Sequence, residues 1–505
     1  MKRDATRNRR RRAGARFRLA LTLVTLLTAG CAVGPNFVRP APPDVRAYTT
    51  EPLPAELSAG VDEPSQITTG SDAVASDWWQ VFGSPAIEDV VRQALAANRS
   101  LAAARSTLAA ADETVQQARG GYYPQLDVGA SAEARRRSSD HGGDTYHVSD
   151  TYALGPTLSF TPDIFGANRR FVEQKQALAA NECFQVAASY LGITGNAVTQ
   201  AITTASLRAE IAAVESVVAD DEHNLTLVRE RQDAGKAALV DVVAAEEQLA
   251  ADQAQLPPLR QALNVTSDAL AVLVARFAGE WSPPAFELTA LTLPHELPLS
   301  VPSALVRQRP DILAAEAQLH ADSAAIGVAT AEMYPKLTLT GAAAFDTSSV
   351  VWDVASELTA PVFRGGSLRA QKRAAVDTYD ASLARYQQTV LAAFGQVADT
   401  LHALVNDADL VATRRRSLDA SRKSLSLQRE SYAYGKSDLI RLLDAERVYE
   451  EALVGYVSAV SQRYADTAAL YVVMGRGWWE RPGDESRAIG DCLDDSQSRG
   501  PSKTL

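Results

Sequence analysis

The chain contains two copies of one sequence unit, and this internal repeat constrains its fold more than any other feature. Residues 100–126 align with residues 311–337 at an offset of 211, and residues 227–246 align with residues 427–446 at an offset of 200. The smaller offset in the later part reflects a longer polar loop in the first copy, around residues 135–150. Because each copy of a repeat forms one structural unit, we expect the same elements to occur twice in the same order.

Each copy is predicted to contain a β-hairpin. After each of two Tyr-Pro pairs, apolar and polar residues alternate, as Leu126, Val128 and Ala130 do in the first copy, and this is the period of a strand. The hairpins are expected at about 124–163 and about 335–363. Strands of about ten residues have the length needed to cross an outer membrane. The alternative is a half-buried sheet of a soluble protein, which shows the same alternation.

A long helix is predicted after each hairpin, at 166–234 and 366–434. Neither segment contains proline, and each would be about 100 Å long at 1.5 Å per residue, which is typical of a coiled coil. A glycine then turns the chain into a return helix, which Pro257 and Pro258 should break in the first copy only. Shorter or returning helices are expected at about 85–121, 238–275, 302–333 and 438–475.

Two hairpins raise a problem of closure. They supply four strands, and an open sheet leaves unpaired edge amides that hydrocarbon cannot satisfy. If the strands cross a membrane, several chains must close the sheet together, and three chains would give twelve strands, within the range of outer-membrane barrels. Asp127, Glu133 and Arg135 belong to the polar set of the first strand, so we predict that they face the lumen.

Residues 1–30 have the architecture of a secretory signal peptide. Basic residues precede an apolar run at 19–27, which is shorter than the roughly 20 residues of a transmembrane helix. Small residues before Cys31 predict cleavage ahead of this cysteine and attachment of a diacylglycerol to its sulfur. Thr28 stands where such sites usually have leucine, and the alternative is an ordinary cleaved signal that ends at a cysteine. Ala32, in place of aspartate, is compatible with export to the outer membrane.

The mature chain is strongly acidic. Without residues 1–30 it has 41 Lys and Arg against 60 Asp and Glu, a formal net charge of −19 at pH 7. Nucleic acid is therefore not an expected partner, because phosphate binding requires clustered cations. Both a disulfide between Cys183 and Cys492 and two unpaired thiols are compatible with the sequence.

Motifs that carry catalytic chemistry are absent from the sequence. It has no HExxH, GxSxG, Walker or CxxC pattern, and its six histidines are scattered. We therefore expect that the protein is not an enzyme, that it binds no metal, and that it carries no cofactor other than the lipid on Cys31.

Several motifs together resemble the TolC-like outer-membrane efflux proteins, and in particular the lipoprotein branch associated with resistance-nodulation-division (RND) pumps. The resemblance covers nearly the whole mature chain. The motifs that carry it are Cys31-Ala-Val-Gly-Pro-Asn-Phe, Trp78-Trp79 with Phe82, the two Tyr-Pro hairpins, Asp163-Ile-Phe-Gly166, Phe363-Arg-Gly-Gly366 and the paired Gly-Lys-x-x-Leu turns.

The resemblance implies an α+β membrane protein that assembles as a homotrimer. A twelve-stranded β-barrel in the outer membrane would be continued by a twelve-helix α-barrel in the periplasm, with an equatorial domain around it. The parts would be a signal peptide 1–30, a lipidated N-terminal and equatorial segment 31–83, repeat 1 at 84–276, an equatorial linker 277–302, repeat 2 at 303–475 and a C-terminal tail 476–505.

The resemblance also implies a function and two sites. The trimer would passively conduct small molecules from a periplasmic adaptor and an inner-membrane RND-type pump to the exterior of a Gram-negative cell. The residues matching the helix tips that contact the adaptor are Gly235, Lys236, Tyr434, Gly435 and Lys436. The residues matching the periplasmic aperture are Ile440, Asp444 and Asp241, where Arg441 replaces an acid of some relatives.

Two other functions fit part of the pattern. A structural periplasmic coiled-coil adaptor would explain the long helices, but the period-two strands argue against it. The exit duct of a type I protein secretion system would share the whole fold. The Cys31-Ala-Val-Gly-Pro start favours small-molecule efflux by resemblance.

Overall fold

The structure is a computed structural model that describes residues 32–60, 63–69, 75–138, 146–346 and 349–475. The side chains of residues 135–138, 146–149, 151 and 346 are not described. The chain forms two compact units that alternate along the sequence. One contains residues 107–182 and 315–387 with the segment that ends at Pro40, and the other contains 41–106, 183–314 and the chain from 388 onward. The predicted signal peptide and C-terminal tail lie outside the described residues.

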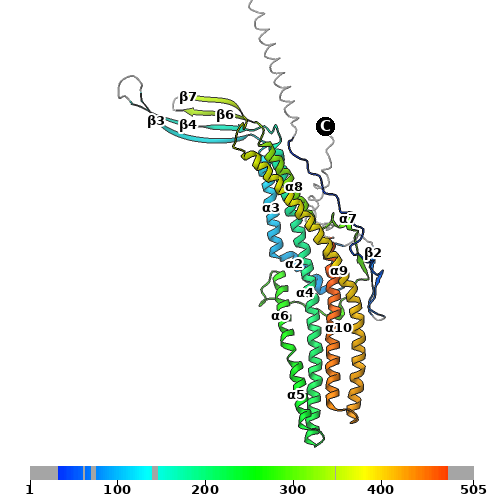
Figure 1. Ribbon diagram of the computed structural model, residues 1–505. Coiled ribbons are helices and arrows are strands. Elements are labelled where there is room, and N and C mark those ends of the chain that lie inside the picture. The colour runs from blue at the N-terminus through cyan, green and yellow to red at the C-terminus, as the bar shows by residue number, and fades with distance from the viewer. Residues whose placement is uncertain (1–31, 61–62, 70–74, 139–145, 347–348, 476–505) are drawn as a thin grey trace, which may run out of the picture. The chain divides into compact units, whose positions relative to one another are not determined.

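Helices and strands follow the same order in the two halves of the chain (Figure 1). A helix leads into a hairpin, and the hairpin leads into a helix of 67 residues in both copies. In the first copy these elements are α3 (Arg99–Gly120), β3 (Gln125–Ser138), β4 (Tyr146–Phe160) and α4 (Ala167–Asp233), and in the second they are α8 (Pro310–Ala331), β6 (Lys336–Asp346), β7 (Ser349–Thr359) and α9 (Ser367–Ala433).

The return arms differ between the copies. The second copy has one helix, α10 (Leu439–Met474), whereas the first has two, α5 (Leu239–Gln253) and α6 (Leu256–Leu273). We expected the interruption at Pro257-Pro258, but the structure has it at Ala254 and Gln255. Both prolines lie in the first turn of α6, where no intrahelical N–H bond is lost. The proline pair therefore starts a helix rather than breaking one.

The helical stretches that precede the hairpins are also divided, which corrects the single helices expected there. In the first copy, α2 (Pro85–Ala97) ends at Asn98, whose side-chain oxygen accepts bonds from the backbone N–H groups of Ser100 and Leu101 at 2.9 and 3.2 Å. Asn98 therefore caps the start of α3. In the second copy, a four-residue helix α7 (Pro302–Leu305) precedes α8.

A small sheet joins the N-terminal segment to the linker between the repeats. The strands β1 (Glu56–Leu57), β2 (Gln66–Thr69) and β5 (Glu296–Pro298) pair in the order β1-β2-β5, and β2 runs parallel to β5. The 3-10 helix η1 (Trp78–Phe82) and the 3-10 helix η2 (Leu288–Ala290) belong to the same two segments. These short elements occupy the ranges that the resemblance assigns to an equatorial domain.

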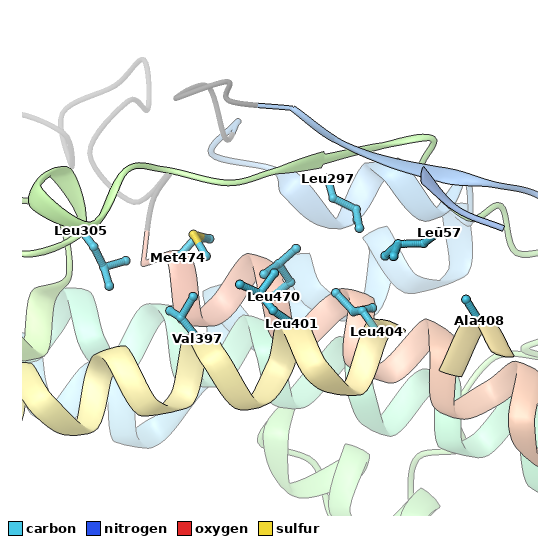
Figure 2. Close-up of a cluster of buried hydrophobic side chains, with 9 residues drawn as sticks. All are labelled: Leu57, Leu297, Leu305, Val397, Leu401, Leu404, Ala408, Leu470 and Met474. Atoms are coloured by element: carbon cyan, nitrogen blue, oxygen red, sulfur yellow. The ribbon is translucent and has the colours of Figure 1, made fainter. Parts of the chain in front are cut away.

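The short elements are held to α9 and α10 by an apolar core (Figure 2). Leu401 and Leu404 of α9 pack with Leu470 of α10, and Leu57 and Leu297 of the small sheet cover them. Every one of these five side chains is buried. Full burial of one leucine contributes about 1.5–3 kcal/mol, so this core fixes the small sheet on the coiled coil.

Trp78 supplies a second attachment for the same region. Its ring stacks on Tyr471 of α10 with the centroids 5.4 Å apart, and Phe82 is fully buried next to it. The Trp-Trp motif of the sequence is thus a packing anchor.

Cys183 lies fully buried in α4 and is disulfide-bonded. Cys492, one of the two possibilities that the sequence left open for Cys183, lies outside the described residues.

No helix in the described part of the chain combines the length and the apolar character needed to span a membrane.

Candidate functional site

The four long strands form one antiparallel sheet in the order β3-β4-β6-β7. Residues paired across neighbouring strands point to the same face, so the register defines the composition of each face. Leu126 pairs with Leu158, Leu154 with Phe345, and Ala343 with Trp352. These pairs place one apolar face across all four strands.

The apolar face is exposed in the single chain. Val128, Trp352 and Val354 have exposed fractions of 74%, 73% and 79%. A continuous apolar surface of this extent on a soluble chain would require a partner surface, whereas in a membrane it faces lipid.

The opposite face of this sheet is polar. Asp127 pairs with Thr157, and Asp353 pairs with Ala342 on the same face. Glu133, predicted in the lumen, belongs to this set by its register with Thr151. Arg135 pairs with Ser149 in the register, and its side chain lies outside the described residues.

The outer edges of this sheet are open in the single chain. Within the described residues, β3 pairs only with β4, and β7 pairs only with β6. All eleven residues of β7 are exposed. Open edges of strands this long bind other strands, and hydrocarbon does not tolerate them.

The segment that follows Cys31 is held in place by Arg170 of α4. The Arg170 side chain is 6% exposed, and its guanidinium donates to the carbonyl of Val33 at 3.2 Å and to Asn36 Oδ1 at 2.7 Å. Its charge is compensated by Glu173, whose carboxylate lies 2.7 Å away. The backbone N–H of Val33 donates to the carbonyl of Phe165 at 3.1 Å, next to the end of β4.

Gly166 is required where this segment passes. It has a φ of 79°, and a Cβ at this position would come within 2.6 Å of Ala32 Cα. The residue next to Cys31 therefore lies at the junction between β4 and α4. Cys31 itself lies outside the described residues.

The two turns that follow the long helices have the same geometry. Gly235 and Gly435 have left-handed φ angles of 70° and 69°. The N–H of Lys236 donates to the carbonyl of Arg231, and the N–H of Lys436 donates to that of Ser431, at 2.7 and 2.9 Å. These bonds close each helix in a Schellman-type cap, so the glycines have a conformational role in addition to any contact with a partner. At the second turn, the Nζ of Lys436 lies 5.6 Å from the ring centroid of Tyr434, which is 71% exposed.

The predicted aperture residues lie just after these turns. Ile440 is 69% exposed on the first turn of α10, and Asp444 follows on the same helix face. The carboxylate of Asp444 accepts from Arg447 at 2.8 Å. Arg441, considered as a modifier of the ring charge, lies 3.7 Å from Asp438 instead.

Asp241 has a different local role. Its Oδ2 accepts from the backbone N–H of Ala238 at 2.9 Å, which caps the start of α5. A cap explains the acid at this position without an aperture, and the two roles are compatible.

Sequence reasoning missed Arg170 and Arg447. A signal for Arg447 was present, because it lies three residues after Asp444 and such pairs share a helix face. No local pattern marks Arg170, because its partners Val33 and Asn36 are more than 130 residues away in the chain. Among the described residues, no group of three or more His, Cys, Asp and Glu side chains has an arrangement that could hold a metal ion.

The chain matches known proteins along most of its length. The outer membrane efflux protein family matches residues 90–276 and 301–476. Nodulation protein T of Rhizobium leguminosarum bv. trifolii is 27% identical over 473 residues, which cover 90% of this chain and 96% of that protein. Outer membrane protein OprJ of Pseudomonas aeruginosa is 27% identical over 508 residues, which cover 94% and 97%.

Solved structures share the fold. The outer-membrane channel OprN superposes with a TM-score of 0.79 at 27% identity, covering 89% of this chain and 100% of that chain. The Campylobacter jejuni CmeC outer membrane channel superposes with a TM-score of 0.81 at 19% identity, covering 92% and 98%. These matches assign the protein to the outer membrane of a Gram-negative cell, extending into the periplasm. The chain belongs to the outer membrane efflux protein family, the TolC-like family that its motifs resemble.

Proposed function

We propose that three copies of this chain form an efflux duct through the outer membrane. The observation that carries this proposal is the two-faced sheet with open edges: β3 of one copy would pair with β7 of the next, and three copies would close twelve strands. The apolar face would then contact lipid, and the face with Asp127 and Glu133 would line a water-filled lumen. Closure would satisfy every edge amide.

The long helices would continue the duct into the periplasm. Each chain contributes the long helices α4 and α9 and two return arms, α5 with α6 and α10. Three chains would therefore supply twelve helical arms. The two glycine turns would form the periplasmic tips. Lys236 and Lys436 at these turns, with Tyr434, offer charged and aromatic groups to a periplasmic adaptor, and the adaptor would connect the duct to an inner-membrane RND-type pump.

The start of α10 would form the aperture. Around a threefold axis, Ile440 would narrow the opening and Asp444 would form a ring of carboxylates. Arg447 would partly neutralise the negative charge of this ring. An ion pair this exposed contributes little to stability, typically below about 1 kcal/mol. Asp241 would contribute from the first copy while it caps α5.

A lipid on Cys31 would anchor the duct beside its barrel. The hydrogen bonds of Arg170 support this position, because they hold residues 33–36 near the end of β4. A diacylglycerol attached next to Ala32 would enter the inner leaflet at that place.

Small molecules are the proposed cargo. Relatives of this chain include a pyoverdine export protein of Pseudomonas aeruginosa, 26% identical, and a toluene efflux pump component of Pseudomonas putida, 25% identical. Relatives of one fold that export such different compounds support a passive duct, because a polar lumen discriminates little between small molecules.

The experiment is a deletion of the gene in its host, followed by measurement of the accumulation and toxicity of a panel of small compounds. We expect at least one compound to accumulate, and the wild-type gene to reverse this. The same test with Cys31→Ser should show less outer-membrane protein and partial reversal. A deletion strain that accumulates no compound of the panel, although the pump and adaptor are expressed, would contradict the proposal.

A further inference from the structure

Four carboxyl groups are buried together where three helices of one unit meet. Asp221 of α4, Asp252 of α5, and Glu446 and Glu450 of α10 are each 2–3% exposed. Burying an ionised carboxylate is unfavourable unless a cation or several donors compensate it. The compensation within this group is incomplete.

The available donors reach only part of the group. Gln248 and Gln255 donate to Asp252 at 2.7 and 3.2 Å, and Gln255 also donates to Glu450 at 2.8 Å. Neither oxygen of Asp221 receives a hydrogen bond from a donor group. The Asp252 carboxyl acts on both Asp221 and Glu450 and raises the pKa of each. Neighbouring carboxyl groups can hydrogen-bond to one another only if one of them is protonated.

Among the residues that the structure describes, Arg429 is the cation that contacts these carboxyl groups. Arg429 of α9 lies 3.3 Å from Glu446 and 2.5 Å from Asp220, so its charge is already divided between two acids. Asn224 donates to Glu446 at 2.8 Å, and Glu451 adds a further negative charge on the α10 side. Protons must therefore supply the remaining compensation.

The electrostatics agree with this geometry. Burial, followed by the hydrogen bond and charge of Asp252, raises the pKa of Asp221 to about 8. The same causes raise the pKa of Glu450 to about 7, and burial raises the pKa of Glu446. Asp221 also lines a small cleft with Val217 and Tyr449.

The repeat shows that packing alone does not require these acids. At the offset of 200, Asp221 corresponds to Ser421 and Asp252 corresponds to Ala452. Both of these residues are buried, at 6% and 5% exposure. A small neutral residue thus fills each position in the second copy.

The cluster of buried carboxyl groups lies at the interruption of the first return arm. Asp252 lies in the last turn of α5, and Gln255, which bridges it to Glu450, lies in the interruption between α5 and α6. The intact helix α10 has no such break. These carboxyl groups therefore lie at the end of α5, where the first return arm is interrupted.

We propose that Asp221, Asp252 and Glu450 form a proton-sharing carboxyl triad that holds α5 against α4 and α10 at acidic and neutral pH and loosens it at alkaline pH. In the closed triad, Asp252 accepts hydrogen bonds from the protonated carboxyls of Asp221 and Glu450. When Asp221 and Glu450 lose their protons, three negative charges face one another at the end of α5. This repulsion makes it easier for α5 to move away from α4 and α10.

The sign follows from linkage. The pKa values of Asp221 and Glu450 are raised in the folded chain, so the folded state holds more protons than the unfolded state between about pH 4 and about pH 8. The contribution to stability is complete below about pH 4 and is lost as pH rises through about 7 to 8. The consequence for the periplasmic tip, which α5 extends from Gly235, rests on the proposed function, whereas the shared protons do not.

Infrared difference spectroscopy of the full chain in detergent tests the shared protons directly. On a change from about pH 6 to about pH 9, the wild type should lose the carbonyl band of a protonated carboxylic acid, and Asp221→Asn should lose a smaller band. The exposed acid of α5, Glu247, provides the matched control Glu247→Gln, which should behave as the wild type. Identical difference spectra for the wild type and Asp221→Asn would overturn the proposal.

Amide hydrogen exchange tests the loosening of α5. Wild type and variant are compared at equal pH, which removes the intrinsic pH dependence of exchange. The ratio of the wild-type exchange rate to the variant exchange rate for amides of residues 239–253 should rise with pH up to about pH 8, by at most about tenfold per pH unit, and should remain high at about pH 9. Asp221→Ser, the residue of the second copy, serves if Asp221→Asn does not fold.

Equal exchange of the wild type and both variants at about pH 9 would overturn the proposal. A pH effect that disappears with a chelator would also overturn it, in favour of a bound cation. Neither method requires conduction, so both remain readable if the proposed function is wrong.

Discussion

Arg170 shows how a single buried side chain sets the position of a chain terminus. Its guanidinium joins the segment after Cys31 to α4, and Gly327 of α8 leaves the space for it, because a Cβ there would come within 2.7 Å of Arg170 Cγ. Burial alone would raise the pKa of Glu173, but hydrogen bonds from His320 and Arg170 outweigh it and lower the pKa. Glu173 is therefore a stable anionic partner for the guanidinium.

Arg170→Met should destabilise the chain by about 1–3 kcal/mol, because it leaves the carbonyl of Val33 and Asn36 Oδ1 without their donor and removes one of the two partners of the partly exposed Glu173 carboxylate. The measurement is the thermal unfolding midpoint in detergent, together with the rate of proteolysis within residues 32–40. Arg92→Met removes an exposed ion pair and should change stability by less than about 0.5 kcal/mol. Equal behaviour of the two variants would contradict the role of Arg170.

Asp444→Ala should raise the conductance of the closed channel, because a smaller side chain widens the opening, and should lower its preference for cations, because the ring loses its carboxylates while Arg447 keeps its pair with Glu451. Single-channel recording in a planar bilayer measures both quantities. Glu451→Ala is the matched control: it removes the other acid bound to Arg447, at 2.6 Å, and Glu451 lies about two turns further along α10 than Asp444. An unchanged closed-state conductance and selectivity in Asp444→Ala would exclude Asp444 from the aperture.

The sequence predicts residues of the site unevenly. The turn glycines follow from the repeat, whereas Ile440 and Asp444 were identified by the resemblance to the efflux family. Helical spacing adds only that these two residues share a face. The partners of Arg170 and the acids around Asp252 do not follow, because both groups form only when segments distant in sequence meet. A lone Asp221 on a helix of this composition gives no signal that it is buried.

At the scale of elements, the two Schellman-type turns depend on the left-handed conformation of a single glycine each. Gly435→Ala should cost about 1–2 kcal/mol, because alanine is strained at a φ of 69°. Gly395→Ala, in the middle of α9 where an added Cβ meets no atom within 4 Å, should instead stabilise the chain by about 0.5–1 kcal/mol.

Thermal unfolding of the two glycine variants measures this difference of sign. If Gly435→Ala and Gly395→Ala shift the unfolding midpoint in the same direction, the geometry proposed for the turn is wrong.

Strand β7 tests the assignment of faces with two adjacent residues. Val354 lies on the apolar face and Ala355 on the polar face. Val354→Arg should cost about 2–4 kcal/mol if it lies near the bilayer midplane, and it should reduce the amount of folded protein in the outer membrane. Ala355→Arg should leave that amount nearly unchanged. The opposite result would reverse the two faces.

Element boundaries show where sequence patterns are sufficient. The long helices were expected at 166–234 and 366–434, and α4 and α9 agree within one residue at each end, because glycines mark both limits. The sequence pattern did not predict the positions of the helix breaks at Asn98 and at Ala254-Gln255. A capping asparagine within a helical pattern and prolines in the first turn of a helix are both compatible with an unbroken period, so the period alone does not locate them.

At the scale of the whole molecule, one chain is an incomplete structure. The open edges of β3 and β7, the exposed apolar face of their sheet, and the exposed tip residues Ile440 and Tyr434 all lack a partner surface in the described single chain. No single one of these features requires a trimer. A threefold assembly would cover all of them together, and four strands per chain match the barrel size that three copies produce.

The number of copies is the most direct test of this account. Native mass spectrometry of the mature protein, extracted from the outer membrane and kept in lipid, measures it without assuming a substrate, a pump or an adaptor. We predict a single assembly of three chains. A monomer or a dimer that retains its folded sheet in lipid would contradict the account, because the edges of β3 and β7 would then be satisfied in another way.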